Sequence, residues 1–194
     1  WIGKGRLAES DTIVEAVEEI LRPRGDLIGR CVLVTAGPTE ENIDPVRYLG
    51  NRSSGRMGFA IAAEAIARGA RVILIAGPTE VKPPVAAELK RVRSSEEMFQ
   101  AVSEHVDQAD VVVMVAAVAD YTPSRGEVDQ KISKEKNELT LYLRRTPDIL
   151  GAVSKRRGSR GYPVLVGFAA ETTDVVEKAR AKLRTKNLDL IVAN

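Results

Sequence analysis

The chain has 194 residues, 44% of them hydrophobic and 29% charged, a composition typical of a soluble globular domain. A net charge of +2 and an aromatic content of 4% argue against a nucleic-acid or membrane partner. The single cysteine excludes an internal disulfide and a cysteine metal cluster. Without a signal peptide or an apolar run of about 20 residues, the protein is expected to be cytoplasmic.

Hydrophobic patterning predicts helices that alternate with strands, which favours an α/β domain. Helices are predicted over residues 11–22, 55–69, 94–105 and 174–186, and from Thr146 onward with Thr146 as N-cap. Strands are predicted over residues 30–35, 71–76, 88–92, 110–116, 139–143, 163–167 and 188–193. Residues 121–136 are polar and are predicted to form a loop.

Two regions are expected, residues 1–28 as a linker with an N-terminal helix and residues 29–194 as a nucleotide-binding domain. The chain starts without Met and stops at Asn194, directly after a predicted core strand. We therefore expect it to be part of a longer protein that continues into a C-terminal tail.

The stretch from residue 35 to residue 69 connects two predicted strands through a long loop and a helix, which is a βαβ unit with parallel strands. Ligands of such sheets bind beyond the carboxyl ends of the strands. Ser53, Ser54 and Gly55 lie where the helix should begin, and Arg47, Arg52 and Arg56 flank them. This pattern indicates a phosphate site at a helix N-terminus, or else an ordinary capped helix with solvated arginines.

The ends of the first two strands repeat, since residues 32–40 read VLVTAGPTE and residues 72–80 read VILIAGPTE. The repeat indicates that both strands reach the same edge of the sheet and turn there with the same Gly-Pro chemistry. We interpret the second copy as a structural turn.

Neither a Ser-His-Asp nor a Cys-His arrangement for nucleophilic catalysis is indicated by the sequence. Cys31 lies at the start of the first strand and is expected to be a buried structural thiol. His105 is the only histidine and lies near a helix C-terminus, so a surface structural role is expected. Any enzyme chemistry should therefore depend on positioning and electrostatics, with Lys, Arg or a metal ion.

Several charged residues could serve such chemistry. Asp120 follows a buried strand, where a carboxylate contacts a ribose hydroxyl or Mg²⁺, or else forms an Asx turn. Lys131, Lys134 and Lys136 share one polar segment, and a charge run of this kind is usually solvated. Lysines 178, 182 and 186 recur every four residues, which describes a solvent-facing stripe unless the helix leans over a ligand.

Six motifs, in order along nearly the whole chain, resemble the phosphopantothenate–cysteine ligase family: DPVRYLGNRSSGRMGFAIA, AAVADY, the following Lys-Ile, TPDIL, VGFAAET and KNLDLIVAN. More narrowly, they resemble the ligase half of the bacterial bifunctional coenzyme A biosynthesis proteins. The GRLAES near the start resembles the link after the flavin-dependent decarboxylase half, so FMN would belong only to that absent half.

The resemblance implies a Rossmann-like fold, with a mostly parallel sheet and helices on both faces, and a homodimer. It also implies that 4′-phosphopantothenate is joined to cysteine with CTP and Mg²⁺. An acyl-cytidylate forms as pyrophosphate leaves, and the cysteine amine then attacks and releases CMP. This chemistry agrees with the absence of a protein nucleophile.

The resemblance assigns roles to individual residues. Asn51 matches the residue that handles the acyl-cytidylate, Arg47 one that acts near the same centre in the cysteine-dependent step, and Lys131 the lysine that neutralises the triphosphate. Asp120 matches a carboxylate at the nucleotide and metal. The remaining matched positions bind the nucleotide: Ser53, Ser54, Gly55, Met114, Val115, Ala116, Pro147, Asp148, Ile149, Leu150, Phe168, Lys182 and Lys186.

Some alternatives stay open. Lys131-Ile132-Ser133-Lys134 departs from the family's Lys-Ile-Lys-Lys, which leaves the role of Lys134 undecided. ATP could replace CTP, because base contacts through the backbone leave no trace in a sequence. An NAD(P)-dependent oxidoreductase would need a glycine fingerprint after Thr35, which is absent. A non-catalytic nucleotide sensor would keep the Ser-Ser-Gly turn without needing Asn51, Asp120 and Lys131 together.

Overall fold

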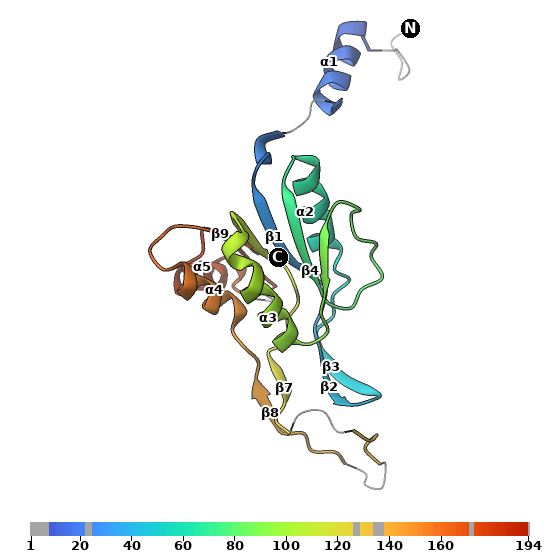
Figure 1. Ribbon diagram of the computed structural model, residues 1–194, viewed down its shortest axis with the longest axis vertical. Coiled ribbons are helices and arrows are strands. Elements are labelled where there is room, and N and C mark those ends of the chain that lie inside the picture. Colours follow the sequence, from blue (N-terminus) through green and yellow to red (C-terminus); the bar gives the residue numbers. More distant parts are fainter. Residues whose placement is uncertain (1–7, 22–24, 126–128, 134–137, 171–172, 194) are drawn as a thin grey trace.

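The computed structural model describes residues 8–21, 25–125, 129–133, 138–170 and 173–193, and Figure 1 shows them. A six-stranded sheet forms the centre of the molecule, and each neighbouring pair of its strands is parallel. The strands are β1 (Cys31–Ala36), β4 (Arg71–Ala76), β5 (Glu88–Arg91), β6 (Val111–Met114), β9 (Val164–Ala169) and β10 (Leu190–Ala193).

The strand order is β10-β9-β6-β1-β4-β5, which is the order of a doubly wound Rossmann-like sheet. The order reverses between β1 and β6, whose neighbouring registers pair Val32 with Val111 and Thr35 with Met114. Connections leave these two strands in opposite directions, which opens a crevice at their carboxyl ends. The predicted fold class is confirmed.

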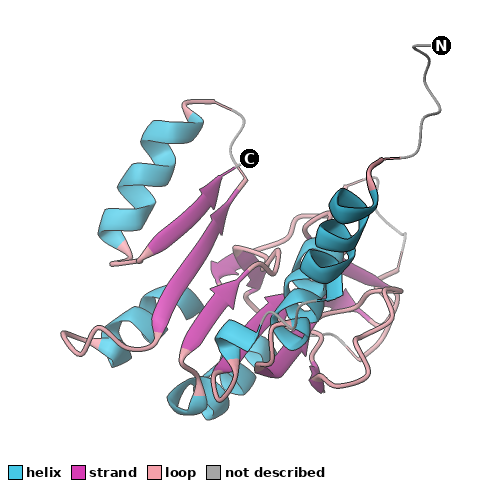
Figure 2. Cartoon of the chain, turned by 90° about the horizontal axis from the view of Figure 1, so that it is seen from above, coloured by secondary structure: helices cyan, strands magenta, loops and turns pink. Residues whose placement is uncertain are grey.

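Helices cover both faces of the sheet (Figure 2). They are α2 (Arg56–Ala67), α3 (Ser95–His105), α4 (Ile149–Arg157) and α5 (Val175–Thr185), with α1 (Ser10–Leu21) and the short 3₁₀ helices η1 (Gly25–Leu27) and η2 (Val106–Gln108). Side chains of β1 alternate between two cores, Leu33 packing with α3 and α4, and Val34 with α2. In Figure 1, α1 stands apart from the sheet. None of the helices in the described part of the chain is long and apolar enough to cross a bilayer.

Two antiparallel hairpins extend from the carboxyl edge of the sheet (Figure 1). The first pairs β2 (Glu40–Asp44) with β3 (Arg47–Gly50), and the second pairs β7 (Tyr121–Pro123) with β8 (Leu143–Arg145). We use "the arm" for β7, β8 and the described residues between them.

Both hairpins correct the sequence predictions. The long loop after β1 contains β2 and β3, and the segment from Tyr121, predicted to be a loop, begins with β7. The strand predicted over residues 139–143 begins only at Leu143, whose side chain is 43% exposed, so its apolar alternation does not mark a half-buried strand. Short polar hairpins of this kind are stabilised by contacts with the rest of the protein, which a local pattern does not report.

The helix starts were predicted with mixed success. Ser94 caps α3 as predicted, and its hydroxyl accepts a hydrogen bond from Glu97 N. The predicted N-cap of α4 was wrong, because the cap is Asp148, whose carboxylate accepts from Gly151 N at 3.0 Å. Thr146 instead donates its hydroxyl to Ala119 O, so the helix begins two residues later.

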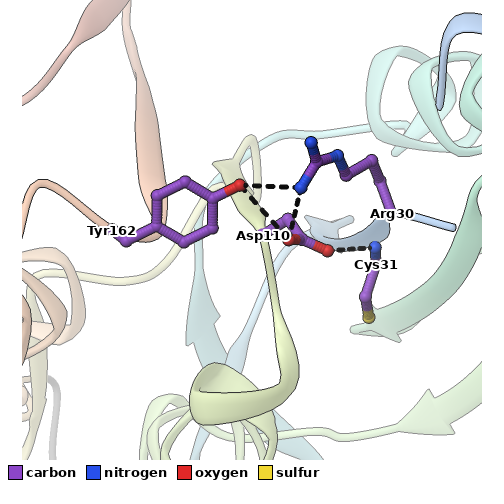
Figure 3. A network of polar contacts seen from close by, with 4 residues as sticks. All are labelled: Arg30, Cys31, Asp110 and Tyr162. Carbon is purple, nitrogen blue, oxygen red and sulfur yellow. Dashed lines mark hydrogen bonds and ion pairs between the residues drawn. The ribbon is translucent and has the colours of Figure 1, made fainter.

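The amino ends of the strands are joined by a polar network around Asp110 (Figure 3). Its carboxylate accepts from Cys31 N at 2.6 Å, from Tyr162 Oη at 3.3 Å and from Arg30 Nη1 at 3.4 Å. The bond from Cys31 N, aided by Tyr162 and Arg30, holds the pKa of Asp110 below its usual value. Cys31 is 5% exposed and burial raises the pKa of its thiol, which agrees with the predicted structural role.

Candidate active site

Thr35 holds the end of β6 at the point where the strand order reverses. This side chain is fully buried, and its Oγ1 accepts hydrogen bonds from Val115 N and Ala116 N, both at 3.2 Å. The same hydroxyl contacts Met114 Sδ at 3.9 Å. The predicted nucleotide-lining residues Met114, Val115 and Ala116 therefore lie together at the mouth of the crevice.

Hydrogen bonds from two threonines hold the chain after β6. Thr39 is also fully buried, and its Oγ1 accepts a hydrogen bond from Ala119 N at 2.9 Å, while Thr146 Oγ1 donates one to Ala119 O at 2.6 Å. The next residue is Asp120, whose backbone O accepts from Thr146 N at 3.1 Å and whose side chain is exposed. Its backbone is fixed while its carboxylate faces solvent at the carboxyl edge of the sheet.

Asn51 connects the first hairpin to this segment. It follows β3 directly, and its Nδ2 donates to Val118 O at 2.9 Å. Because Val118 lies two positions before Asp120, the structure brings Asn51 and Asp120 to the same region, although the two residues are far apart in the sequence. Its side-chain oxygen points to no partner that the structure identifies among the described residues, so it can accept a hydrogen bond from a ligand.

The turn before α2 is packed between two glycine turns. Gly55 has φ 76°, and a Cβ there would lie 3.3 Å from Gly37 Cα and 3.3 Å from Thr79 Oγ1. Thr79 Oγ1 donates to Ser54 O at 2.8 Å, which fixes the carbonyl before Gly55. The second Gly-Pro-Thr copy is therefore a structural turn, and its Thr79 holds in place the turn at which the phosphate site is predicted.

Two serine hydroxyls contact the first N–H groups of α2. Ser53 Oγ accepts from Gly55 N at 3.2 Å, and Ser54 Oγ accepts from Arg56 N at 3.4 Å. Both serines and Arg56 are exposed. The positive end of the helix dipole lies at this turn, and an anion could replace the two serine hydroxyls as the acceptor of these N–H groups.

The predicted contacts on α4, β9 and α5 also gather at this edge. Lys186 Nζ pairs with Asp148, and Lys182 Nζ donates to Phe168 O at 2.8 Å. Burial disfavours ionisation of Asp148, but Lys186 and Gly151 N outweigh it and lower the pKa of Asp148. Pro147 lies beside Asp148, whereas Ile149 is 4% exposed and packs, like Leu150, in the core. The Ile149 side chain is therefore closed to a ligand, whereas Leu150 is only partly buried against the same core.

A third group joins Arg47 to the arm through Asp44. Arg47 Nη2 donates to Ile132 O at 2.9 Å, and Asp44 Oδ2 accepts from Ile132 N at 3.2 Å. Lys131 is the preceding residue and its side chain is exposed, while Lys134 lies outside the described residues. Sequence reasoning missed Asp44, although an Asp-Pro pair at a turn was a usable signal.

Asp120 is the one predicted metal ligand. Among the described residues no group of three or more His, Cys, Asp or Glu side chains could hold a metal ion. Mg²⁺ commonly keeps several waters and binds through one or two carboxylates together with substrate phosphates. A single exposed carboxylate at the same edge of the sheet as the predicted phosphate site fits that mode and does not fit a closed protein cage.

The sequence is similar to that of known proteins along most of its length. The family model of the DNA/pantothenate metabolism flavoprotein C-terminal domain matches residues 27–194. The coenzyme A biosynthesis bifunctional protein CoaBC of Bacillus subtilis is 46% identical over 197 residues, which cover 100% of this chain and 48% of that protein. CoaBC of Escherichia coli K12 is 44% identical over 196 residues, with the same coverages. The chain spans about half the length of these curated relatives.

Solved structures agree. The crystal structure of the C-terminal domain of a CoaBC protein has a TM-score of 0.76 at 45% identity, covering 88% of this chain and 79% of that one. The DNA/pantothenate metabolism flavoprotein from Streptococcus pneumoniae has a TM-score of 0.75 at 28% identity, covering 86% and 82%.

Proposed function

Because the chain belongs to the DNA/pantothenate metabolism flavoprotein C-terminal domain family, we propose that it is a phosphopantothenate–cysteine ligase acting in coenzyme A biosynthesis. Its substrates would be 4′-phosphopantothenate, L-cysteine and CTP, and its products would include pyrophosphate and CMP. The names of its relatives support the pathway, and the geometry of the crevice supports the type of chemistry.

The observation that carries the proposal is the bond from Asn51 to Val118 O across the crevice. It brings an amide, the anion-binding turn at Ser53–Gly55 and the Asp120 carboxylate to one edge of the sheet. Cys31 lies buried at the opposite edge, and His105 Nδ1 lies 2.8 Å from Ala101 O at the end of α3. Activation of a carboxylate by a nucleotide suits this set, since it requires phosphate binding and no protein nucleophile.

In the first step, a carboxylate oxygen of 4′-phosphopantothenate attacks the α-phosphorus of CTP. The bond to the bridging α–β oxygen breaks and pyrophosphate leaves. The turn before α2 and Lys131 would bind the phosphates, and Lys182 and Lys186 would face the nucleotide. Asn51 would hold the acyl carbonyl with the second hydrogen of Nδ2, the first being donated to Val118 O.

In the second step, the cysteine amine attacks the acyl carbon, loses a proton and expels CMP. Arg47 would act in this step near the same centre. When bound, Mg²⁺ would neutralise phosphate charge, and Asp120 is the residue that would hold it beside the nucleotide.

A measurement of nucleotide preference tests the nucleotide assignment. We expect CTP to raise the thermal midpoint more than ATP or NAD, by the stabilisation that binding to the native state confers. A preference for ATP would keep the ligase chemistry and change the base assignment. A preference for NAD would favour an oxidoreductase, and nucleotide binding without turnover would favour a sensor.

We further propose that the active form is a cytoplasmic homodimer and that the natural protein is fused to a flavin-dependent decarboxylase half. The share of the relatives' length that the chain covers supports a larger protein. FMN would belong to that other half, which leaves CTP and Mg²⁺ as the small molecules of this domain besides the two substrates.

A further inference from the structure

We propose that Asp44 is a positioning residue that holds Arg47 and the arm as one unit and so sets the place of Lys131 at the nucleotide. The inference rests on the proposed function, because it assigns Lys131 to the phosphates of CTP. It adds a residue to which neither the sequence motifs nor the comparisons give a role.

Asp44 is the last residue of β2, and it is 1% exposed. A buried carboxylate is costly unless hydrogen bonds and an opposite charge compensate it. Each of its two oxygens has defined partners, and those partners belong to different segments of the chain.

The first oxygen shapes the local turn. Asp44 Oδ1 accepts from Val46 N and from Arg47 N, both at 2.9 Å. This is the geometry of an Asx turn, and it needs only one acceptor oxygen. It accounts for the tight connection between β2 and β3.

The second oxygen reaches across 88 positions of sequence to the arm. Asp44 Oδ2 accepts from Ile132 N at 3.2 Å and lies 3.4 Å from Arg47 Nε. Arg47 Nη2 completes the ring by donating to Ile132 O at 2.9 Å. Both backbone groups of Ile132 are therefore held, which fixes the residue that follows Lys131.

The ionised state of Asp44 supports the same role. Burial alone would raise its pKa, but bonds from Val46 N, Ile132 N and Arg47 N, with the charge of Arg47, hold the pKa of Asp44 below its usual value. The carboxylate is charged at neutral pH, so its link to Arg47 is a charge-assisted one.

Asp44→Asn separates the two oxygens. The amide oxygen can keep the Asx turn, whereas the NH₂ group faces the Ile132 N–H and the Arg47 guanidinium, which are all donors. The variant therefore releases the arm and leaves the hairpin turn in place.

The test is a double-mutant cycle on pyrophosphate release, with the whole chain and with 4′-phosphopantothenate, cysteine, CTP and Mg²⁺. We expect Asp44→Asn to lower kcat/KM for CTP about tenfold in the native background, since residues linked through one backbone segment couple in this way. In the Lys131→Ala background, where the positioned group is already gone, we expect less than about a twofold further loss. Equal losses in both backgrounds, or no loss in the native one, would overturn the proposal.

Asp110→Asn is a matched control. Asp110 also accepts a backbone N–H and faces an arginine, but it lies at the amino ends of the strands (Figure 3). We expect it to lower the thermal midpoint without changing kcat/KM of the folded protein. Equal kinetic losses in Asp110→Asn and Asp44→Asn would mean that both act through stability, and the positioning role would fall.

A second pair of variants covers the case in which Asp44→Asn fails to fold. Ile132→Pro deletes the N–H that Asp44 accepts, and Ile132→Ala keeps it. We expect only the proline variant to reproduce the loss, and equal activity of both would overturn the proposal. Absence of pyrophosphate release by the unaltered chain would refute the proposed function itself, and this inference with it.

Discussion

Three aspartates stabilise this fold in the same way, with a carboxylate that accepts backbone N–H groups at a turn, a helix start or a strand start. Asp44 and Asp148 do so at the carboxyl edge of the sheet, and Asp110 at the amino edge. Each has a lowered pKa because the folded state supplies hydrogen bonds and a nearby cation to the charged form. The three carboxylates also join segments that are far apart in the sequence, since Asp44 bonds Ile132, Asp110 bonds Cys31 and Asp148 pairs with Lys186. Single residues thus fix the placement of whole elements.

The lowered pKa values of these aspartates predict that acid destabilises the fold. A carboxyl group with a folded pKa below 3.8 contributes stability that is present above that unfolded value and is lost as the pH falls through the folded pKa. We therefore expect the free energy of unfolding, measured by urea denaturation, to fall as the pH drops below about 4. Asp110→Asn should show a smaller fall, because it removes one of the groups responsible. An equal fall in the variant would show that Asp110 does not contribute.

Asn51 allows a second prediction at this scale. Asn51→Ala removes the amide that bonds Val118 O and, in the proposed mechanism, the acyl carbonyl. We expect pyrophosphate release to fall about a hundredfold, as for loss of one preorganised donor at a reacting carbonyl. Tyr48→Ala, at an exposed residue of the preceding strand β3, serves as the control for general damage to this hairpin. Unchanged turnover of Asn51→Ala would remove Asn51 from the mechanism.

At the scale of elements, α2 lies against β1 through a glycine. A Cβ on Gly58 would stand 2.5 Å from Ala36 Cβ and 3.0 Å from Thr35 O, so the helix could not keep its distance from the strand. We expect Gly58→Ala to lower the free energy of unfolding by about 1–3 kcal/mol, the usual cost of overpacking. Ala63→Leu, at an exposed position of the same helix, should change it by less than about 0.5 kcal/mol.

The elements also show how far sequence reasoning reaches. The central strands were predicted because buried parallel strands are continuous apolar runs, as in Val111–Met114. The hairpin Glu40–Gly50 was not, because its strands are rich in charged residues whose partners are distant. Glu41, 4% exposed, is satisfied by Ser95 N at 2.8 Å, and a local pattern cannot report a contact across 54 residues.

The candidate site followed the same rule. Motifs indicated Asn51, the Ser53–Gly55 turn and Asp120, and the structure places them at one edge of the sheet. The link between Lys131 and Arg47 could not be predicted, because it runs through the backbone of Ile132 and the buried carboxylate of Asp44.

At the scale of the whole molecule, the arm is the surface expected to form the dimer. Leu139, Tyr142 and Leu143 are 51%, 69% and 43% exposed, and β8 is the edge of a two-stranded sheet. An edge of this kind can pair with another chain. We expect Leu139→Glu with Leu143→Glu to convert the proposed dimer to a monomer in light scattering. Val85→Glu, at another exposed apolar residue, should leave the mass unchanged.

The central claim is that this domain activates a carboxylate with CTP and then transfers it to cysteine. The most direct measurement is pyrophosphate release with 4′-phosphopantothenate, CTP and Mg²⁺, with and without cysteine. We predict a burst that stops near one pyrophosphate per active site without cysteine and sustained turnover with it. Release that does not depend on 4′-phosphopantothenate, or a rate that is the same with and without cysteine, would contradict the account.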